Sequence, residues 1–524
     1  MWIFGSEGVS IYRSDGSAKI NQIPAEKACH NVTSASGSQI RCDWRDVVSD
    51  GKKYVWAAVS RGTAKIDIFS IETGAIVGAF DTCMAPRDLD FHPLRDEMWV
   101  HCGEYSDMVD SHLDVFSVSS PSAPISTSVT LHDGTLARSF GKLKTDPTLG
   151  DVAYATVYGQ PFLHKIDLSS RVLEESFRLG ANEPKLDGIY EMTYSAQNQH
   201  IFARTQVCCS CGFAGADLEE CGHYGITNIT VNGQQVTGQC GRHCEGGPTD
   251  TIGVYEFDTV TNSLVGTHPF VGSGAVDAPF ASPLGDYIVM FGMNGGKTVD
   301  ILAAGENGVT SQLAWTLNLD FNITNTEDMA VYADFAFIEH RGTKTIILSS
   351  SNENKVAIVD LASGSPEISY VVFSTDAVVS RSTRQIEWAH GTNYVWVSGR
   401  DVNKVYVVDY VEKTLVNTID TPSTKFLTVQ NDEFLAYSAR IGDHLGRNGG
   451  TSSSSPASFF GGKDSDVNTT TEALSIAAIF MSTLAIVTVL GSAFMAMKKK
   501  KQPNIEKQGV VGKDEESHVL PSVN

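Results

Sequence analysis

Six cysteines and two histidines are concentrated in one segment of the sequence, residues 205–250. In an oxidising compartment, six thiols can form three disulfides, which stabilise a loop too polar and too rich in glycine to bury a core of its own. Thiolates and imidazoles are also the usual ligands of zinc. The segment lacks the two CxxC pairs of common zinc fingers, so we favour disulfides over a metal site. The residues concerned are Cys208, Cys209, Cys211, Cys221, Cys240, Cys244, His223 and His243.

The other four cysteines form two pairs that are close in sequence. Cys29 precedes Cys42, and Cys83 precedes Cys102, each pair within neighbouring predicted strands or turns. An even number of cysteines in a region outside the cytosol indicates a disulfide framework. We therefore take these two pairs as the remaining plausible bridges.

Three histidines recur beside strand-like segments: His92 in FHP, His340 in EHRG and His390 in EWAHG. If they occupy the same place in a repeated unit, they could converge as metal ligands or acid–base groups. The alternative is that each hydrogen-bonds the next strand. The sequence contains no GxSxG, HExxH, phosphate-binding or dinucleotide-binding motif. We therefore assign no catalytic residue, no metal ligand and no cofactor, and leave enzymatic activity open.

The segment that must position these residues is a repeated hairpin. In NKVYVVDYVEKTLVNTID, residues 403–420, two alternating runs of β-branched residues flank a polar turn, which is typical of a β-hairpin. Eight copies of this hairpin can be found, and we call the residue that ends the first strand of each copy its anchor. The anchor of the N-terminal copy is Arg13. The intervals are roughly 45 to 57 residues, and one interval about twice as long contains the cysteine-rich segment. The first strand of the other seven hairpins ends at Ser70, Ser117, Asp167, Asp258, Ala303, Asp360 and Asp409.

Two further strand-like pieces precede most of these hairpins, which gives four short strands per repeat. That is the pattern of a β-propeller blade. The sequence therefore predicts an all-β propeller over residues 1–446, with residues 205–250 inserted between the second and third strands of one blade. Eight anchors predict eight blades, and seven is the alternative. We expect the segment from Phe426 to supply the missing strand of the N-terminal blade and so close the ring.

The hairpins KVYVVDYVEKTLV, KVAIVDLASGSPEI and KIDIFSIETGAIV resemble those of the YVTN-type and quinoprotein-amine-dehydrogenase-like propellers, which carry a VxVID…tGkvv hairpin. The resemblance extends roughly from Met1 to Gly446 and implies a blade rather than an activity. The adjacent Cys208 and Cys209 are also similar to the adjacent-cysteine ring of quinone-dependent alcohol dehydrogenases, which are propellers as well. No other part of that family's signature is present.

Residues 473–497, ALSIAAIFMSTLAIVTVLGSAFMAM, contain no charged side chain. At about 1.5 Å per residue, a helix of this length crosses a hydrocarbon core of about 30 Å. Four lysines follow, residues 498–501, and the positive-inside rule places them in the cytosol. We therefore expect a single-pass type I protein of the plasma membrane or an endomembrane. Its propeller is outside the cytosol, residues 447–472 are a Gly/Ser/Thr stalk, and residues 498–524 are the cytoplasmic tail.

Shorter motifs agree with this topology. The N-x-[ST] glycosylation sequons, all before the predicted span, are at Asn31, Asn228, Asn322 and Asn468. The tail sequence EESHVL resembles an acidic dileucine sorting signal, with Glu515 as its acidic residue and Val519 and Leu520 as its apolar pair; an unstructured acidic tail is the alternative. The opening MWIFGSEGVS is not a recognisable signal peptide. We therefore expect that the natural product begins further upstream or that a signal has been removed.

Composition limits the class of partner. Charged residues make up 19% and hydrophobic residues 42%, which is globular composition. A net charge of −22 argues against nucleic acid as a partner, because binding phosphates needs a basic face.

From these features we expect a receptor-like protein whose propeller binds another protein, a glycan, or a small chelate such as an iron–siderophore that is taken up by endocytosis. The overall layout is similar to that of the iron-starvation-induced surface proteins of marine microalgae. The first alternative is a membrane-anchored propeller enzyme, either a lactonase-like hydrolase or a quinone-dependent oxidoreductase. The second is an adhesion module.

Overall fold

A computed structural model of the chain describes residues 1–427 with internal gaps. One compact unit spans Met1–Ser454, and a second, Ser455–Asn524, lies wholly outside the described residues. The gaps are 35–36, 43, 52, 60–63, 93, 104–111, 122–125, 132–140, 158–161, 180–186, 208–226, 232–233, 239–252, 272–275, 293–297, 307, 322–332, 341–342, 351–352, 375–384, 400–401 and 422–424.

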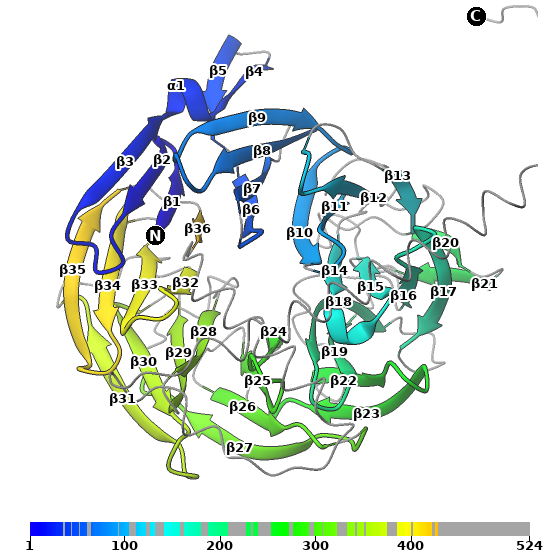
Figure 1. Cartoon of the computed structure of the whole chain (residues 1–524). Helices are drawn as coiled ribbons and strands as arrows, with labels where there is room; N and C mark the ends of the chain where they lie inside the picture. The colour runs from blue at the N-terminus through cyan, green and yellow to red at the C-terminus, as the bar shows by residue number, and fades with distance from the viewer. Residues whose placement is uncertain are drawn as a thin grey trace, which may run out of the picture. The chain divides into compact units, whose positions relative to one another are not determined.

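The first unit is a ring of eight four-stranded antiparallel sheets, the blades of a β-propeller (Figure 1). The first-named strand of each blade is the innermost, and the last is at the rim. Blade 1 contains β36 (Lys425–Leu427), β1 (Trp2–Gly5), β2 (Gly8–Tyr12) and β3 (Lys19–Pro24), and blade 2 contains β6 (Trp44–Ser49), β7 (Tyr54–Val59), β8 (Lys65–Ser70) and β9 (Ile76–Asp81). Blade 3 contains β10 (Pro86–His92), β11 (Glu97–Cys102), β12 (His112–Ser117) and β13 (Ser126–Thr130), and blade 4 contains β14 (Gly141–Thr145), β15 (Val152–Val157), β16 (Phe162–Asp167) and β17 (Val172–Arg178).

Blades 5 to 8 follow the same order, and two smaller sheets lie outside the blades. Blade 5 contains β18 (Asp187–Ser195), β19 (His200–Val207), β22 (Gly253–Asp258) and β23 (Ser263–Pro269), and blade 6 contains β24 (Val276–Ala281), β25 (Tyr287–Gly292), β26 (Thr298–Ala303) and β27 (Gln312–Asn318). Blade 7 contains β28 (Ala333–His340), β29 (Thr343–Ser350), β30 (Lys355–Asp360) and β31 (Glu367–Val372), and blade 8 contains β32 (Gln385–Trp388), β33 (Tyr394–Gly399), β34 (Lys404–Asp409) and β35 (Thr414–Asp420). The smaller sheets are the hairpins β4 (His30–Ser34) with β5 (Gly37–Arg41) and β20 (Thr227–Val231) with β21 (Gln234–Gly238).

The predicted repeat is confirmed, with eight blades rather than seven. All seven anchors outside the N-terminal copy are the last residue of the third strand of a blade, and the eighth, Arg13, directly follows β2. The cysteine-rich insertion lies where it was predicted, between the second and third strands of blade 5, and contains β20 and β21. The β-propeller fold is therefore readable from the hairpin period alone.

The anchor residue explains why the hairpin repeats so clearly. The Asp409 carboxylate accepts hydrogen bonds from the backbone N–H groups of Val411 and Glu412 at 3.0 and 2.9 Å, and thereby orders the turn into β35. Lys413, the last residue of that turn, has a φ of 55°. The equivalent residue after Ser70 is Gly74, at 62°, which glycine adopts without strain. This geometry accounts for the Asp and Gly of the hairpin motif.

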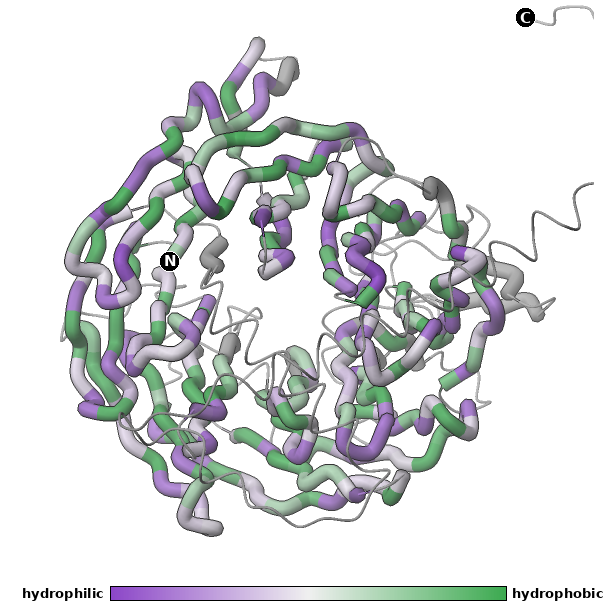
Figure 2. Tube along the Cα trace, viewed as in Figure 1, coloured by the Kyte–Doolittle hydropathy of each residue, from purple (hydrophilic) through white to green (hydrophobic). Residues whose placement is uncertain are grey.

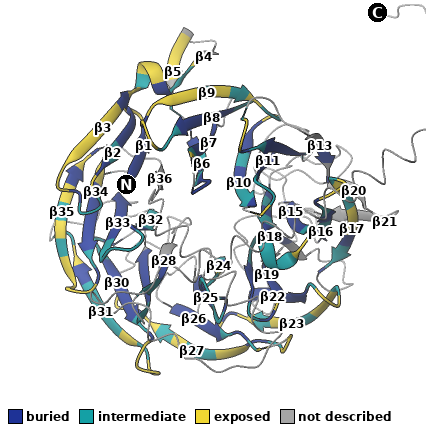
Figure 3. Cartoon of the chain, in the orientation of Figure 1, coloured by how far each residue is buried: buried dark blue, intermediate teal, exposed yellow. Residues whose placement is uncertain are grey.

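Large aromatic side chains fill the wedges between blades. In six blades the third residue of the second strand is aromatic and at most 1% exposed, and each packs on the following blade. The middle strands are accordingly buried, whereas the outer strands consist mostly of exposed and intermediate residues (Figure 3). Figure 2 shows the hydropathy along the same trace. These aromatic residues are Phe4, Trp56, Trp99, Tyr154, Phe202 and Trp396.

Buried aspartates supply a second link between blades. Asp67, Asp114 and Asp300 are each the third residue of the third strand of a blade. Asp114 accepts hydrogen bonds from the Cys83 N–H at 2.7 Å and the Thr82 hydroxyl at 2.9 Å, both in the connection from the preceding blade. Asp67 and Asp300 accept from the corresponding connections. A buried carboxylate paired in this way fixes the junction, because leaving it unpaired would be costly.

The ring closes as predicted. Trp2, Ile3 and Phe4 of β1 pair with residues 425–427 of β36, so the last described strand completes the N-terminal blade. The first residues therefore belong to the fold, as expected from their match to the repeat. Closure in this way hides the edges that an open sheet would expose.

Helix is limited, among the described residues, to the single turns α1 (Ala25–Ala28) and η1 (Pro147–Leu149). Neither is long or apolar enough to cross a bilayer. The predicted stalk (447–472), span (473–497) and tail (498–524) lie outside the described residues, as do Asn322, Asn468, Glu515, Val519 and Leu520.

Candidate functional site

The blade topology gives the propeller two distinct faces. At one end, which we call the insertion face, second strands connect to third strands and each blade connects to the next; the other end is the turn face. The longest connections all belong to the insertion face: 25–43, 208–252, 319–332 and 373–384. Both ends of the described chain, Met1 and Leu427, lie at the turn face, because β1 starts there and β36 ends there.

Both described disulfides are at the insertion face. Cys29 bonds to Cys42 at the base of the β4–β5 hairpin, and Cys83 bonds to Cys102 between the connection before β10 and the end of β11. These are the two pairs suggested by the sequence. The six cysteines of the insertion, Cys208, Cys209, Cys211, Cys221, Cys240 and Cys244, lie outside the described residues, as do His223 and His243.

A belt of ion pairs lies on the innermost strands of blades 3 to 5. Lys142 of β14 contacts Asp88 of β10 at 3.0 Å and Glu191 of β18 at 3.7 Å, and Lys144 lies 3.8 Å from Asp90. The carboxylates also accept backbone N–H groups of the next blade: Leu143 to Asp88 at 2.8 Å, and Thr145 to Asp90. We call these five charged residues, Asp88, Asp90, Lys142, Lys144 and Glu191, the axial belt.

Solvent reaches the axial belt although its strands are the innermost of the ring. The side chains of Lys142 and Lys144 are 31% and 35% exposed. Burial raises the pKa of Asp90 to about 6, while the Lys144 ammonium and the Thr145 N–H act in the opposite direction. The belt therefore presents charged side chains that are partly open to solvent on the innermost strands. The sequence signal for it, missed above, is the alternation in DLD of β10 and KLK of β14.

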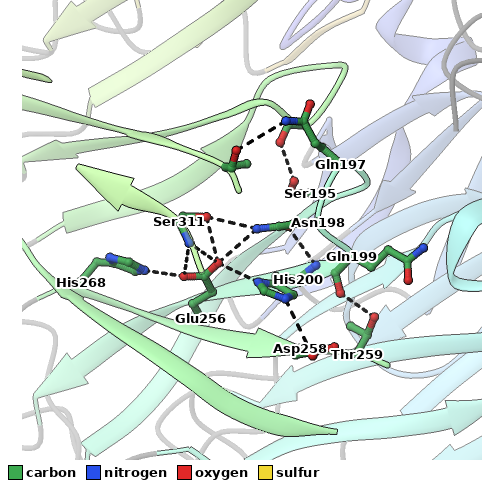
Figure 4. Close-up of polar contacts among 12 residues, drawn as sticks. Ser195, Gln197, Asn198, Gln199, His200, Glu256, Asp258, Thr259, His268 and Ser311 are labelled. Atoms are coloured by element: carbon green, nitrogen blue, oxygen red, sulfur yellow. Dashed lines mark hydrogen bonds and ion pairs between the residues drawn. The ribbon is translucent and has the colours of Figure 1, made fainter. Parts of the chain in front are cut away.

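A second polar cluster lies between blades 5 and 6 (Figure 4). Glu256 of β22, 0% exposed, accepts hydrogen bonds from His200 at 2.7 Å and His268 at 2.6 Å. The Ser311 N–H and hydroxyl and the Asn198 amide also donate to this carboxylate. Burial alone would raise the pKa of Glu256, but these donors hold it at about 2. Since both carboxylate oxygens are bonded and substrate cannot reach them, we assign the cluster a structural role.

The three histidines singled out in the sequence lie at the turn face but do not converge: His92 and His340 are the last residues of β10 and β28, and His390 is two residues beyond β32. His92 belongs to blade 3, which lies opposite blade 7 in a ring of eight. His340 of blade 7 and His390 of blade 8 both contact Trp388, with ring centroids 5.5 and 4.6 Å away. Burial lowers the pKa of His390 to about 4, and His340 contributes. His92 is buried and accepts the Arg95 N–H at 3.3 Å. The three histidines therefore do not meet at one site, and the hydrogen bond that His92 accepts comes from the β10–β11 turn rather than from the next strand.

Near this histidine pair lies a carboxyl group whose pKa is raised by burial. Glu339 of β28 is 8% exposed and lies 4.0 Å from the Lys344 ammonium, which also pairs with Asp286 of blade 6. Burial, with a smaller contribution from the Asp286 carboxylate, raises the pKa of Glu339 to about 8. Within the part of the chain that the structure describes, no group of three or more His, Cys, Asp or Glu side chains could hold a metal ion.

Comparison with known proteins supports the fold and nothing finer. No protein-family model matches the chain, and no curated protein matches it. The dihydro-heme d1 dehydrogenase NirN in complex with DHE is similar in structure, with a TM-score of 0.52, 10% identity, and coverage of 80% of this chain and 72% of that one. The Dos1 propeller matches with a TM-score of 0.45 and 12% identity, over 77% of this chain and 81% of that one. Kuenenia stuttgartiensis hydrazine synthase matches with a TM-score of 0.41 and 12% identity, over 74% of this chain and 89% of that one. At these identities the likeness is to the β-propeller fold alone.

Proposed function

We propose that this protein is a single-pass type I membrane glycoprotein whose propeller binds a ligand or partner outside the cytosol. The observation that carries the proposal is the division of the ring into two faces. The insertion face has the long connections and the two described disulfides, whereas the described chain ends at the turn face, at Leu427. Long connections held by a rigid scaffold are where proteins usually place recognition.

Two further features support this reading. Disulfides such as Cys29–Cys42 and Cys83–Cys102 form in oxidising compartments, in agreement with a propeller outside the cytosol. The sequence after Leu427 contains the stalk, 447–472, then the apolar run 473–497 and four lysines. The ligand classes are another protein, a glycan, or a small chelate such as an iron–siderophore, with the cysteine-rich insertion 205–250 as part of the recognition surface. The axial belt favours a small polar ligand among these.

Membrane topology is the first test. Cells that express the full chain are labelled with a membrane-impermeant amine reagent, intact or after permeabilisation, and the labelled lysines are mapped by mass spectrometry. Exposed propeller lysines such as Lys404 and Lys413 should be labelled in intact cells, and Lys498–Lys501 only after permeabilisation. For an endomembrane location the same comparison is made on sealed vesicles. Labelling of the tail lysines in intact cells, or recovery of the chain without membranes, would reject the proposal.

Ligand binding is the second test. Native mass spectrometry of the full chain in detergent, after enzymatic deglycosylation, should detect a retained small molecule, or else a mass equal to the polypeptide less two hydrogens per disulfide. The latter result directs the search to protein or glycan partners. If the tail sorts the protein into endocytic vesicles, the double variant Val519→Ala and Leu520→Ala should slow internalisation. Unchanged internalisation removes the sorting signal from the proposal.

A further inference from the structure

Two hairpins stand outside the eight blades, and both carry the same tripeptide pattern at the same place. In the β4–β5 hairpin the sequence Asn-Val-Thr begins at Asn31, the second residue of β4. In the β20–β21 hairpin, Asn-Ile-Thr begins at Asn228, the second residue of β20. Both hairpins are insertions in connections of the insertion face. Both sequons therefore start at the second residue of an inserted hairpin, and both hairpins belong to the insertion face. The sequence of the sequons alone does not reveal this.

The register places each acceptor asparagine within a two-stranded ribbon. Asn31 lies opposite Ile40, and Asn228 lies opposite Thr237. Asn31 is exposed, and Ile40 across from it is 47% exposed, an apolar side chain beside the acceptor. A sugar attached to Asn31 would cover this apolar surface.

The β4–β5 hairpin is also fixed to the propeller at its base. The Cys29–Cys42 disulfide joins the residues that flank the two strands. His30 is hydrogen-bonded through Nε2 to the buried Asp67 at 2.8 Å, and this bond raises the pKa of the imidazole, which favours its charged form. The acceptor therefore projects from a constrained ribbon rather than from a loose loop.

We propose that both hairpins are glycan carriers, with Asn31 and Asn228 as the acceptors. In each transfer the asparagine Nδ2 forms a bond to C1 of N-acetylglucosamine, and the bond from that C1 to a lipid-linked diphosphate breaks. The lipid diphosphate leaves with the electron pair, and the amide proton passes to a base of the transferase. This inference rests on the proposed function, since the transfer requires entry into the secretory route.

The two carriers lie at separate places around the ring. The β4–β5 hairpin belongs to the connection between blades 1 and 2, and β20–β21 belongs to blade 5 (Figure 1). Both hairpins belong to connections of the insertion face, so glycans on them would cover part of that face.

The test is site mapping on the full chain expressed in eukaryotic cells. Enzymatic removal of N-glycans converts an occupied asparagine to aspartate, which peptide mass spectrometry should detect at residues 31 and 228. The variants Asn31→Gln and Asn228→Gln should each lose one oligosaccharide from the intact mass. Thr33→Ala and Thr230→Ala should have the same effect, whereas Thr33→Ser keeps the sequon and should keep the glycan. Asn21→Gln, an exposed asparagine of β3 outside any sequon, is the matched control and should change nothing.

The outcomes separate this inference from the proposed function. Occupancy of Asn322 or Asn468 with residues 31 and 228 unmodified overturns the inference and leaves the proposed function standing. Occupancy of one hairpin alone overturns the paired assignment. No glycan at any of the four sequons, together with free thiols at Cys29 and Cys42, overturns both.

Discussion

Trp2 lies directly opposite Leu427 in an antiparallel strand pair, so the first and last described strands of the chain are neighbours in one blade. The ring is held closed by this pairing and by the packing of blade 8 on blade 1, where Trp396 lies in one buried cluster with Ile3 and Tyr12. The rings of Tyr12 and Trp396 have centroids 6.0 Å apart. The closure is therefore a single point at which the whole propeller can be weakened.

Ile3→Pro should destabilise the propeller strongly. The substitution removes a backbone donor from the strand that pairs with both β2 and β36, and it deletes a buried side chain. We expect a loss of about 3 kcal/mol or more of unfolding free energy, measured by denaturant titration of the full chain. Lys19→Pro, at the start of the outer strand β3, is the control and should cost much less. Equal effects of the two substitutions would mean that closure through β1 does not limit stability.

Glu256→Gln should expose the structural role of the cluster between blades 5 and 6. The amide cannot supply the charge that accepts hydrogen bonds from His200, His268 and Ser311. Removing one partner of a buried ionic network lowers the free energy of unfolding by about 3 to 5 kcal/mol. The control is Glu174→Gln, which breaks the exposed ion pair with Lys165 and should lower the free energy of unfolding by about 1 kcal/mol or less. A stability loss at Glu256 no larger than that at Glu174 would contradict the assignment.

The propeller should lose stability as the pH rises towards 8, because of Glu339. Its pKa is about 8 in the folded chain and 4.5 as the ordinary value, so between these limits the folded state binds more protons than the unfolded state. The contribution of Glu339 to stability is therefore fully present below about pH 4.5 and is lost as pH rises through the folded pKa, with a magnitude on the order of 5 kcal/mol.

Two variants isolate this contribution. Glu339→Gln, which stays neutral, should flatten the decline in unfolding free energy between pH 5 and 9. Asp286→Asn should move the decline to lower pH, because it removes the negative charge that helps to raise the pKa of Glu339. The charged groups facing Glu339 are Asp286 and Lys344, with His340 next in sequence. An unchanged pH profile in Glu339→Gln would show that another group titrates.

Removing either described disulfide should lower stability by about 3 kcal/mol, because both close loops of moderate length, 13 and 19 residues. The paired variant Cys83→Ala with Cys102→Ala should cost more than Cys29→Ala with Cys42→Ala. Cys102 is buried against the core between blades 2 and 3, whereas the other pair ties an inserted hairpin. Thermal unfolding of the two double variants is the measurement. The reverse order would mean that the hairpin, not the blade junction, depends on its disulfide.

The sequence alone predicted most of the fold because a hairpin is a local object. The alternation of side chains, the turn aspartate and the glycine that follows are all set within about 20 residues, and they repeat. Eight anchors, the position of the insertion and the closing strand from Phe426 could be predicted for this reason. The two described cysteine pairs were also close enough in sequence to be suggested.

Contacts between blades depend on tertiary structure, and the sequence could not supply them. Asp88 and Lys142 are 54 residues apart, and Glu256 and Ser311 are 55 apart, so only the geometry of the ring brings each pair together. The histidines looked equivalent in sequence, yet closure into eight blades places His92 across the ring from His340. A repeat encodes its own strands through local periodicity, whereas the number and angle of the blades decide which side chains meet at the axis and between neighbours.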